Sequence, residues 1–173
     1  MKVLAFLQNQ WFHDPDHVRS ILKRHPEARR RIVRYSLFCG CKTGRTLKTA
    51  LGEEWCRKIV WEEASPQIGG RASSSFPADP GHILTAIEQE KPTVIIALGQ
   101  IASEAITSLA LPGITILTGP HPTARGVGPL TALRSIRAAL DTMAGFASEG
   151  EYLVRTALNP AAAWPFPPGA RKP

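Results

Sequence analysis

Three amide side chains follow directly on a short apolar segment near the start of the chain. Gln8, Asn9 and Gln10 come in succession, and the aromatic residues Trp11 and Phe12 come next. Amide groups can hold a water molecule or bind the polar edge of a heterocyclic ring. A polar turn without a chemical role is the alternative interpretation of this segment.

A histidine lies between two prolines later in the chain. His121 is flanked by Pro120 and Pro122, and Thr123 and Arg125 follow it. Proline restricts the backbone dihedral φ, so the imidazole should be held rigidly. Because histidine changes its charge near neutral pH, a fixed one is a candidate for catalysis or ligand binding. A structural role is the alternative for a lone histidine.

The segment Phe38–Arg45 combines glycines with groups that suit phosphate. Lys42 and Arg45 supply cations and Thr43 a hydroxyl, and such groups bind the nucleic-acid backbone. The spacing is not that of a P-loop, because Lys-Thr precedes the second glycine instead of following it. We expect a shaped loop here.

The three cysteines do not form a recognisable metal or disulfide framework. Cys39 and Cys41 lack a second pair, and Cys56 stands alone. A zinc or iron–sulfur site is therefore not expected, and no cofactor is predicted. Free cysteines fit a reducing compartment. With no apolar run near 18 residues and no signal peptide, we expect a cytoplasmic protein that does not contact a membrane. We also expect a monomer.

Two adjacent carboxylates, Glu62 and Glu63, end another apolar segment. They could belong to a site, or they could form a solvated acidic turn.

The apolar segments that precede these groups have the character of buried strands. The sequence predicts strands at 3–7, 58–62, 93–98 and 114–117, separated by helices near 16–25, 45–51, 80–90, 103–109 and 130–147. Continuous apolar strands alternating with helices indicate an α/β fold, a single-domain three-layer sandwich with a central four-stranded parallel sheet and helices on both faces. Ligands of such sheets bind beyond the carboxyl ends of the strands, where all the candidate groups lie. Residues 1–158 should form this domain, and 159–173 a Pro/Ala-rich tail.

Positive charge is concentrated in the first third of the chain. The net charge is +7, and residues 1–60 hold thirteen Lys or Arg against five Asp or Glu. Arg29, Arg30 and Arg31 form the densest group. A polyanion is the partner that such an asymmetry favours.

Taken in chain order, these loops resemble the uracil-DNA glycosylase superfamily from about Lys2 to Leu140. The segment Leu7–Trp11 lies where the superfamily has GQDPY or GINPG, and His121-Pro122-Thr123 resembles its HPS motif. Lys91–Gly99 is similar to the KPkvivaLG strand of the iron–sulfur branch, and Leu37–Gly40 to its PFvG motif.

The departures point to a divergent branch. Gln10 replaces the usual proline, the four-cysteine cluster is missing, and Glu62 or Glu63 stands near the position of an asparagine that binds the uracil edge. A carboxylate can accept the ring N3–H, but it donates to O4 only when protonated.

The resemblance implies an enzyme that flips a deaminated base, uracil above all, out of DNA and hydrolyses its N-glycosidic bond. It implies that Asn9 holds the attacking water and that His121 stabilises the leaving base. The implied base-binding residues are Gln8, Trp11, Phe38, Glu62 and Glu63. The expected contacts to DNA are Arg29, Arg30, Arg31, Lys42, Thr43, Arg45, Pro122, Thr123 and Arg125.

Three other functions stay open. A Rossmann-like nucleotide-binding enzyme is disfavoured, because no GxGxxG follows the first strand. A non-catalytic module that binds damaged or abasic DNA would use the same loops. A glycosylase for hypoxanthine would explain the unusual residue at the base-reading position.

Overall fold

A four-stranded parallel sheet forms the centre of the computed structural model, which describes residues 1–8, 10–71, 75–126 and 128–145. The strand order is β3-β1-β5-β6, and every neighbouring pair is parallel. The predicted fold class is therefore confirmed. The strands are β1 (Val3–Leu7), β3 (Val60–Glu63), β5 (Val94–Leu98) and β6 (Thr115–Gly119).

The two central strands, β1 and β5, are buried along their whole length. Side chains alternate between the two faces of a strand, so each central strand contributes to two hydrophobic cores. Leu7 and Leu98 belong to one core, and Phe6 and Ile95 belong to the other. This double burial explains why the strands read as continuous apolar runs rather than as alternating patterns.

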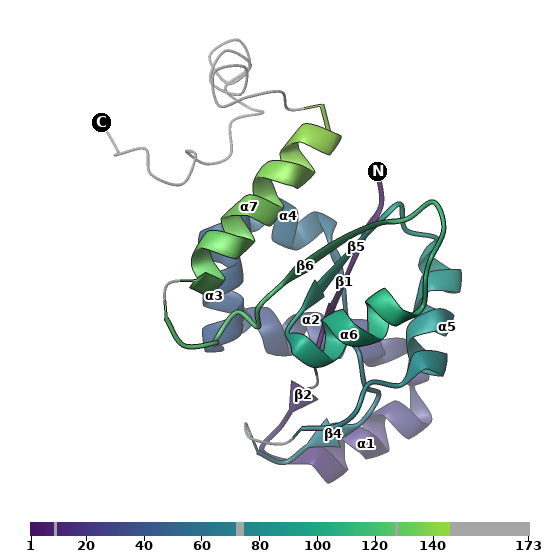
Figure 1. The fold of residues 1–173 in the computed structure, drawn as a ribbon. Coiled ribbons are helices and arrows are strands. Elements are labelled where there is room, and N and C mark those ends of the chain that lie inside the picture. The colour runs from purple at the N-terminus through teal and green to yellow at the C-terminus, as the bar shows by residue number, and fades with distance from the viewer. Residues whose placement is uncertain (9, 72–74, 127, 146–173) are drawn as a thin grey trace.

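Helices cover both faces of the sheet (Figure 1). One core includes side chains from four helices, and the other includes side chains from two. The first set is α2 (Arg29–Phe38), α3 (Lys42–Leu51), α4 (Glu53–Lys58) and α7 (Gly128–Met143), and the second is α5 (Pro80–Glu90) and α6 (Gln100–Ser108).

Two aspartates, each followed by a proline, form the N-caps of helices, as this sequence pattern predicts. Asp14 accepts the backbone N–H of His17 at the start of α1 (Pro15–Arg24), and Asp79 accepts that of His82 at the start of α5. Each satisfies one of the free N–H groups at a helix N-terminus.

The prediction of a shaped loop over Phe38–Arg45 is wrong. Phe38 ends α2, and α3 already begins at Lys42, so only residues 39–41 connect the two helices. The Cys41 sulfur caps α3 by accepting the Gly44 N–H at 3.3 Å. Sulfur is outside the usual set of capping side chains, which is why the sequence does not show this helix start.

A second, two-stranded parallel sheet lies beyond the carboxyl ends of the main sheet, next to α1 (Figure 1). It pairs β2 (Gln10–Trp11) with β4 (Ile68–Gly69), and the Phe12 N–H donates to the Gly69 carbonyl at 2.9 Å. The segment that follows β1 is thereby fixed against the segment that follows β3. A short 3-10 turn, η1 (Pro26–Ala28), separates α1 from α2.

Within the part of the chain that the structure describes, no helix is long and apolar enough to cross a membrane. The predicted tail, 159–173, lies outside the described residues.

The contact between α2 and α3 leaves no space at Gly44. A Cβ atom there would lie 1.7 Å from the Leu37 carbonyl oxygen, so the two backbones would have to separate. We expect Gly44→Ala to lower the free energy of unfolding in urea by about 3 kcal/mol, since backbone atoms cannot move aside as a flexible side chain does. Gly128→Ala, which meets open space, should change it by less than about 0.5 kcal/mol. Equal effects would contradict the close packing.

Candidate active site

A cavity of about 700 Å³ lies at the carboxyl end of the sheet. Its wall includes the ends of β1 and β3, the loop after β6, the end of α2 and the start of α3. Its size is in the range of small-molecule sites. The residues lining it are Leu7, Gln8, Gln10, Phe12, His13, Ser36, Leu37, Cys39, Cys41, Lys42, Thr43, Glu63, His121 and Thr123.

The hydrogen bonds of His121 determine which ring nitrogen carries the proton. The backbone N–H of Thr123 donates to Nδ1 at 3.3 Å, and the Thr123 hydroxyl lies 2.9 Å from the same atom. A backbone N–H can only donate, so Nδ1 is the acceptor and Nε2 carries the hydrogen. Burial lowers the pKa of His121 below its usual 6.5. At neutral pH the ring is therefore uncharged and has one N–H to donate.

A glycine that follows the neighbouring strand packs against this histidine. Gly99 follows β5 with a φ of +98°, a conformation that other residues rarely adopt, and its N–H donates to the Gly119 carbonyl at 2.8 Å. A Cβ at Gly99 would lie 3.5 Å from the His121 Cβ. The strand ends of β5 and β6 thus hold the histidine loop in place.

Glu63 is a buried acid on the cavity wall. It is 2% exposed, and its Oε2 has no hydrogen-bond partner in the described ranges. Burial, reinforced by the negative charge of Glu62 and opposed by Arg29, raises the pKa of Glu63 to about 8. Its side chain is therefore largely a neutral carboxylic acid at pH 7, with one donor and one acceptor side by side.

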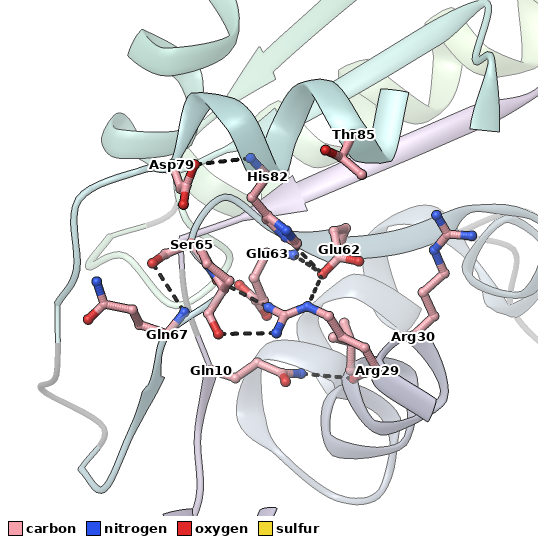
Figure 2. A network of polar contacts seen from close by, with 12 residues as sticks. Gln10, Arg29, Arg30, Glu62, Glu63, Ser65, Gln67, Asp79, His82 and Thr85 are labelled. Carbon is pink, nitrogen blue, oxygen red and sulfur yellow. Dashed lines mark hydrogen bonds and ion pairs between the residues drawn. The ribbon is translucent and has the colours of Figure 1, made fainter. Parts of the chain in front are cut away.

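The neighbouring Glu62, unlike Glu63, is ionised. Figure 2 shows the Arg29 guanidinium between Glu62 and the Ser65 backbone, with His82 approaching Glu62 from α5. Arg29 Nε lies 3.1 Å and His82 Nε2 3.5 Å from Glu62 Oε1. Burial opposes ionisation of Glu62, yet His82 and Arg29 together lower its pKa. Glu62 is thus an ionised partner in a structural ion pair and does not line the cavity.

Of the residues that the sequence singled out, the structure brings one group together. These residues come from four separate segments, and all of them line the cavity: Gln8, Lys42, Thr43, Glu63, His121 and Thr123.

The predicted stacking residue, Phe38, is not among the residues that line the cavity. Its ring packs edge-on against Trp61, with ring centroids 5.6 Å apart, and Lys48 Nζ lies 5.8 Å from its centre. Because Phe38 ends α2 on the face that covers the sheet, it contributes to the core. Phe12 lines the cavity instead, among the side chains that the structure describes.

The three arginines expected to contact DNA, Arg29, Arg30 and Arg31, do not gather at the cavity, and Arg31 is exposed. Arg29 donates to Glu62 and to the backbone carbonyls of residues 65 and 66. Arg30 pairs with Glu90, at the amino edge of the sheet, far along the strands from the His121 loop. None of the three lines the cavity. The buried acids Glu62 and Glu90 account for two of these positive charges.

Other predicted contacts lie outside the cavity wall. Arg45 bonds the Gly40 carbonyl, Arg125 is exposed, and Pro122 is buried. Asn9 lies outside the described residues. Trp11 is placed only by its backbone, which pairs with Gly69.

Several cavity residues were not predicted as site residues. Gln10 is buried, and its amide donates to Ser36 Oγ at 2.6 Å and to the Val33 carbonyl at 3.2 Å. Gln10 and Phe12 belong to the amide and aromatic segment that the sequence singles out, but neither was assigned a role in the site. Ser36 and Cys39 carry no such signal, since only the packing of α2 against the sheet brings them to the site.

No family model, curated protein or solved structure matches the chain. The side chains that line the cavity are the basis for inferring its chemistry. A neutral N–H donor and a neutral acid line one space, which suits a polar, uncharged ring that gains negative charge as it reacts.

Replacing the neutral acid by an amide should stabilise the protein. The folded-state pKa of Glu63, about 8, lies above the ordinary 4.5, so its stability contribution is full below about pH 4.5 and falls as pH rises toward 8. Since pH 7 lies about 2.5 pH units above the ordinary pKa, keeping Glu63 protonated in the folded protein at this pH costs about 3 kcal/mol. We expect Glu63→Gln to raise the free energy of unfolding by about that amount.

Urea denaturation at about pH 5 and pH 8 checks this expectation. The advantage of Glu63→Gln over the wild type should grow between the two pH values, whereas exposed Glu88→Gln should show none. An equal advantage at both pH values would mean that Glu63 is ionised in the folded protein.

Proposed function

We propose that this protein is a DNA glycosylase that hydrolyses the N-glycosidic bond of a deaminated base, most simply uracil. The observation that carries the proposal is the state of His121 on the cavity wall, where Nδ1 accepts the Thr123 N–H and Nε2 keeps its hydrogen. The resemblance of the strand-end motifs to uracil-DNA glycosylases supports it.

Cleavage of this bond separates charge. The C1′–N1 bond breaks with its electron pair on the base, and the sugar becomes cationic at C1′. A neutral imidazole N–H directed at the O2 of the base would stabilise the developing anion without first losing its own proton. Such a preorganised donor contributes about 3 to 4 kcal/mol to transition-state stabilisation.

Water completes the reaction by adding to C1′, and its proton passes to the departing base or to solvent. Asn9 remains our candidate for positioning that water through its amide oxygen. A cationic sugar needs a positioned water more than a strong base.

The base would have to leave the DNA stack to reach the cavity. Among the side chains that the structure describes, Phe12 rather than Phe38 is available for stacking on it, a contact of about 1–3 kcal/mol per base. Lys42 and Thr43 begin α3 at the cavity wall, where a cation, a hydroxyl and the helix N-terminus suit a phosphate.

Incubation with oligonucleotides that carry a single uracil, hypoxanthine, xanthine or mismatched thymine tests the proposal. Alkali converts abasic sites to strand breaks, which reveal base release. Release of uracil is the expected result. Tight binding without release of any base would instead identify a non-catalytic DNA-binding module, and release of hypoxanthine alone would change the substrate.

His121→Ala should reduce the single-turnover rate of uracil excision by about 10² to 10³, because it removes a donor that acts on the leaving group. Unfolding in urea should show that the variant is still folded. Exposed His25→Ala should keep the wild-type rate, and a similarly active His121→Ala protein would remove this residue from the mechanism.

Lys42→Ala should weaken DNA binding and reduce the slope of log Kd against log salt by about one phosphate contact. Exposed Lys91→Gln, at the amino edge of the sheet, is the matched control and should leave the slope unchanged. Fluorescence anisotropy over a salt series measures both. Identical slopes for the two variants would exclude Lys42 from the DNA contact.

A further inference from the structure

The cavity contains a second polar group that the mechanism above does not use. Glu63 ends β3 and lines the same wall as His121. Its side chain is buried and Oε2 is left without a partner among the described side chains. A buried polar atom without a partner is costly, and in a ligand site its natural partner is the ligand.

Strand geometry selects Glu63 over Glu62 for this role. Successive side chains of a strand point to opposite faces of the sheet. Glu62 lies on the face of α5 and is occupied by Arg29 and His82 (Figure 2). Glu63 lies on the other face, where parallel pairing places it beside Leu7 at the end of β1. Of these two carboxyl groups, Glu63 is therefore the one that can contact a base in the cavity.

We propose that Glu63, as a neutral carboxylic acid, is the residue that recognises the base, by pairing with a ring N–H and the adjoining ring carbonyl. This inference rests on the proposed glycosylase function. The acid hydroxyl donates to the carbonyl, and the acid carbonyl accepts the N–H, so two parallel hydrogen bonds form. An amide side chain makes the same pair of bonds, and Glu63 thus replaces an asparagine or glutamine.

The charged groups around Glu63 are consistent with a neutral form. Glu62 is ionised because it pairs with Arg29 of α2, and β3 is an edge strand of the sheet. Across the cavity lie Lys42 of α3, His13 after β2, and the uncharged His121. Arg29 favours ionisation of Glu63, whereas its burial and the charge of Glu62 oppose it more strongly.

The pairing defines a substrate class, bases that present a lactam edge. Uracil presents N3–H beside O4, and hypoxanthine presents N1–H beside O6. Both edges arise when an exocyclic amine is replaced by a carbonyl, which is the result of deamination. An ionised Glu63 could accept the N–H, but it would repel the carbonyl, so recognition should fail as the acid loses its proton.

The test is the pH dependence of single-turnover uracil excision from a single-stranded oligonucleotide, from about pH 6 to about pH 9. The wild-type rate should fall about tenfold per pH unit above about pH 8. Glu63→Gln should keep a rate within about tenfold of the wild type at pH 6 and lose this alkaline decrease, because an amide does not titrate. Glu63→Leu should be about a hundredfold slower than the wild type at pH 6, and the gap should narrow at alkaline pH as the wild type loses its own proton.

Exposed Glu88→Gln is the matched control and should keep the wild-type profile, including any effect of ionisation of the substrate. A wild-type enzyme that excises uracil with the same alkaline decrease in Glu63→Gln would overturn the role of Glu63 and leave the glycosylase intact. If the wild type releases no base, the proposed function fails. Binding of the uracil oligonucleotide at pH 6 and pH 9, in wild type and Glu63→Gln, then tests Glu63 on its own, and equal pH dependence would reject it.

Discussion

The parallel pairing of β1 with β3 on one side and β5 on the other is the constraint on which the candidate site depends. Parallel strands all end at the same edge of the sheet, so each chain segment that leaves a strand begins there. The pairs Leu7–Glu63 and Leu98–Gly119 fix how far each strand extends at this edge. Residues from four distant parts of the sequence therefore meet in one cavity.

The same pairing needs both faces of the sheet to be covered. The faces are apolar, and the hydrophobic effect holds α2, α3, α4 and α7 on one and α5 and α6 on the other. The close approach of α2 and α3 brings the start of α3 to the cavity. The packing of these helices on the core consequently also positions the cavity residues that they carry.

Two adjacent carboxyl groups illustrate how environment assigns chemical roles. Glu62 and Glu63 are neighbours on one strand, yet Glu62 pairs with a guanidinium, whereas Glu63 is buried at the cavity wall and its Oε2 has no partner among the described residues. Their pKa values move in opposite directions for that reason. Pairs of titratable groups separated in this way are typical of sites that need a neutral donor beside charged groups.

The excess of positive charge in the first third of the chain does not by itself locate a binding surface. The first third of the chain carries the surplus, but Arg29 and Arg30 neutralise buried or partly buried acids of β3 and α5. Lys42 is the cation of that region on the cavity wall. Net charge describes the whole molecule, whereas a binding surface depends on which charges stay unpaired.

Local sequence determined the fold class, the four strands and two helix starts, because strand burial, proline and aspartate act over a few residues. It also determined that the strand ends would carry the candidate groups, of which Gln8, Glu63 and His121 do meet. Only the tertiary structure decided between Glu62 and Glu63, packed the partly buried Phe38 against the core, paired Arg30 with Glu90 at the opposite edge, and placed Phe12 at the cavity. Those outcomes depend on which face and which partner a side chain meets, and these are set by packing between segments far apart in the sequence.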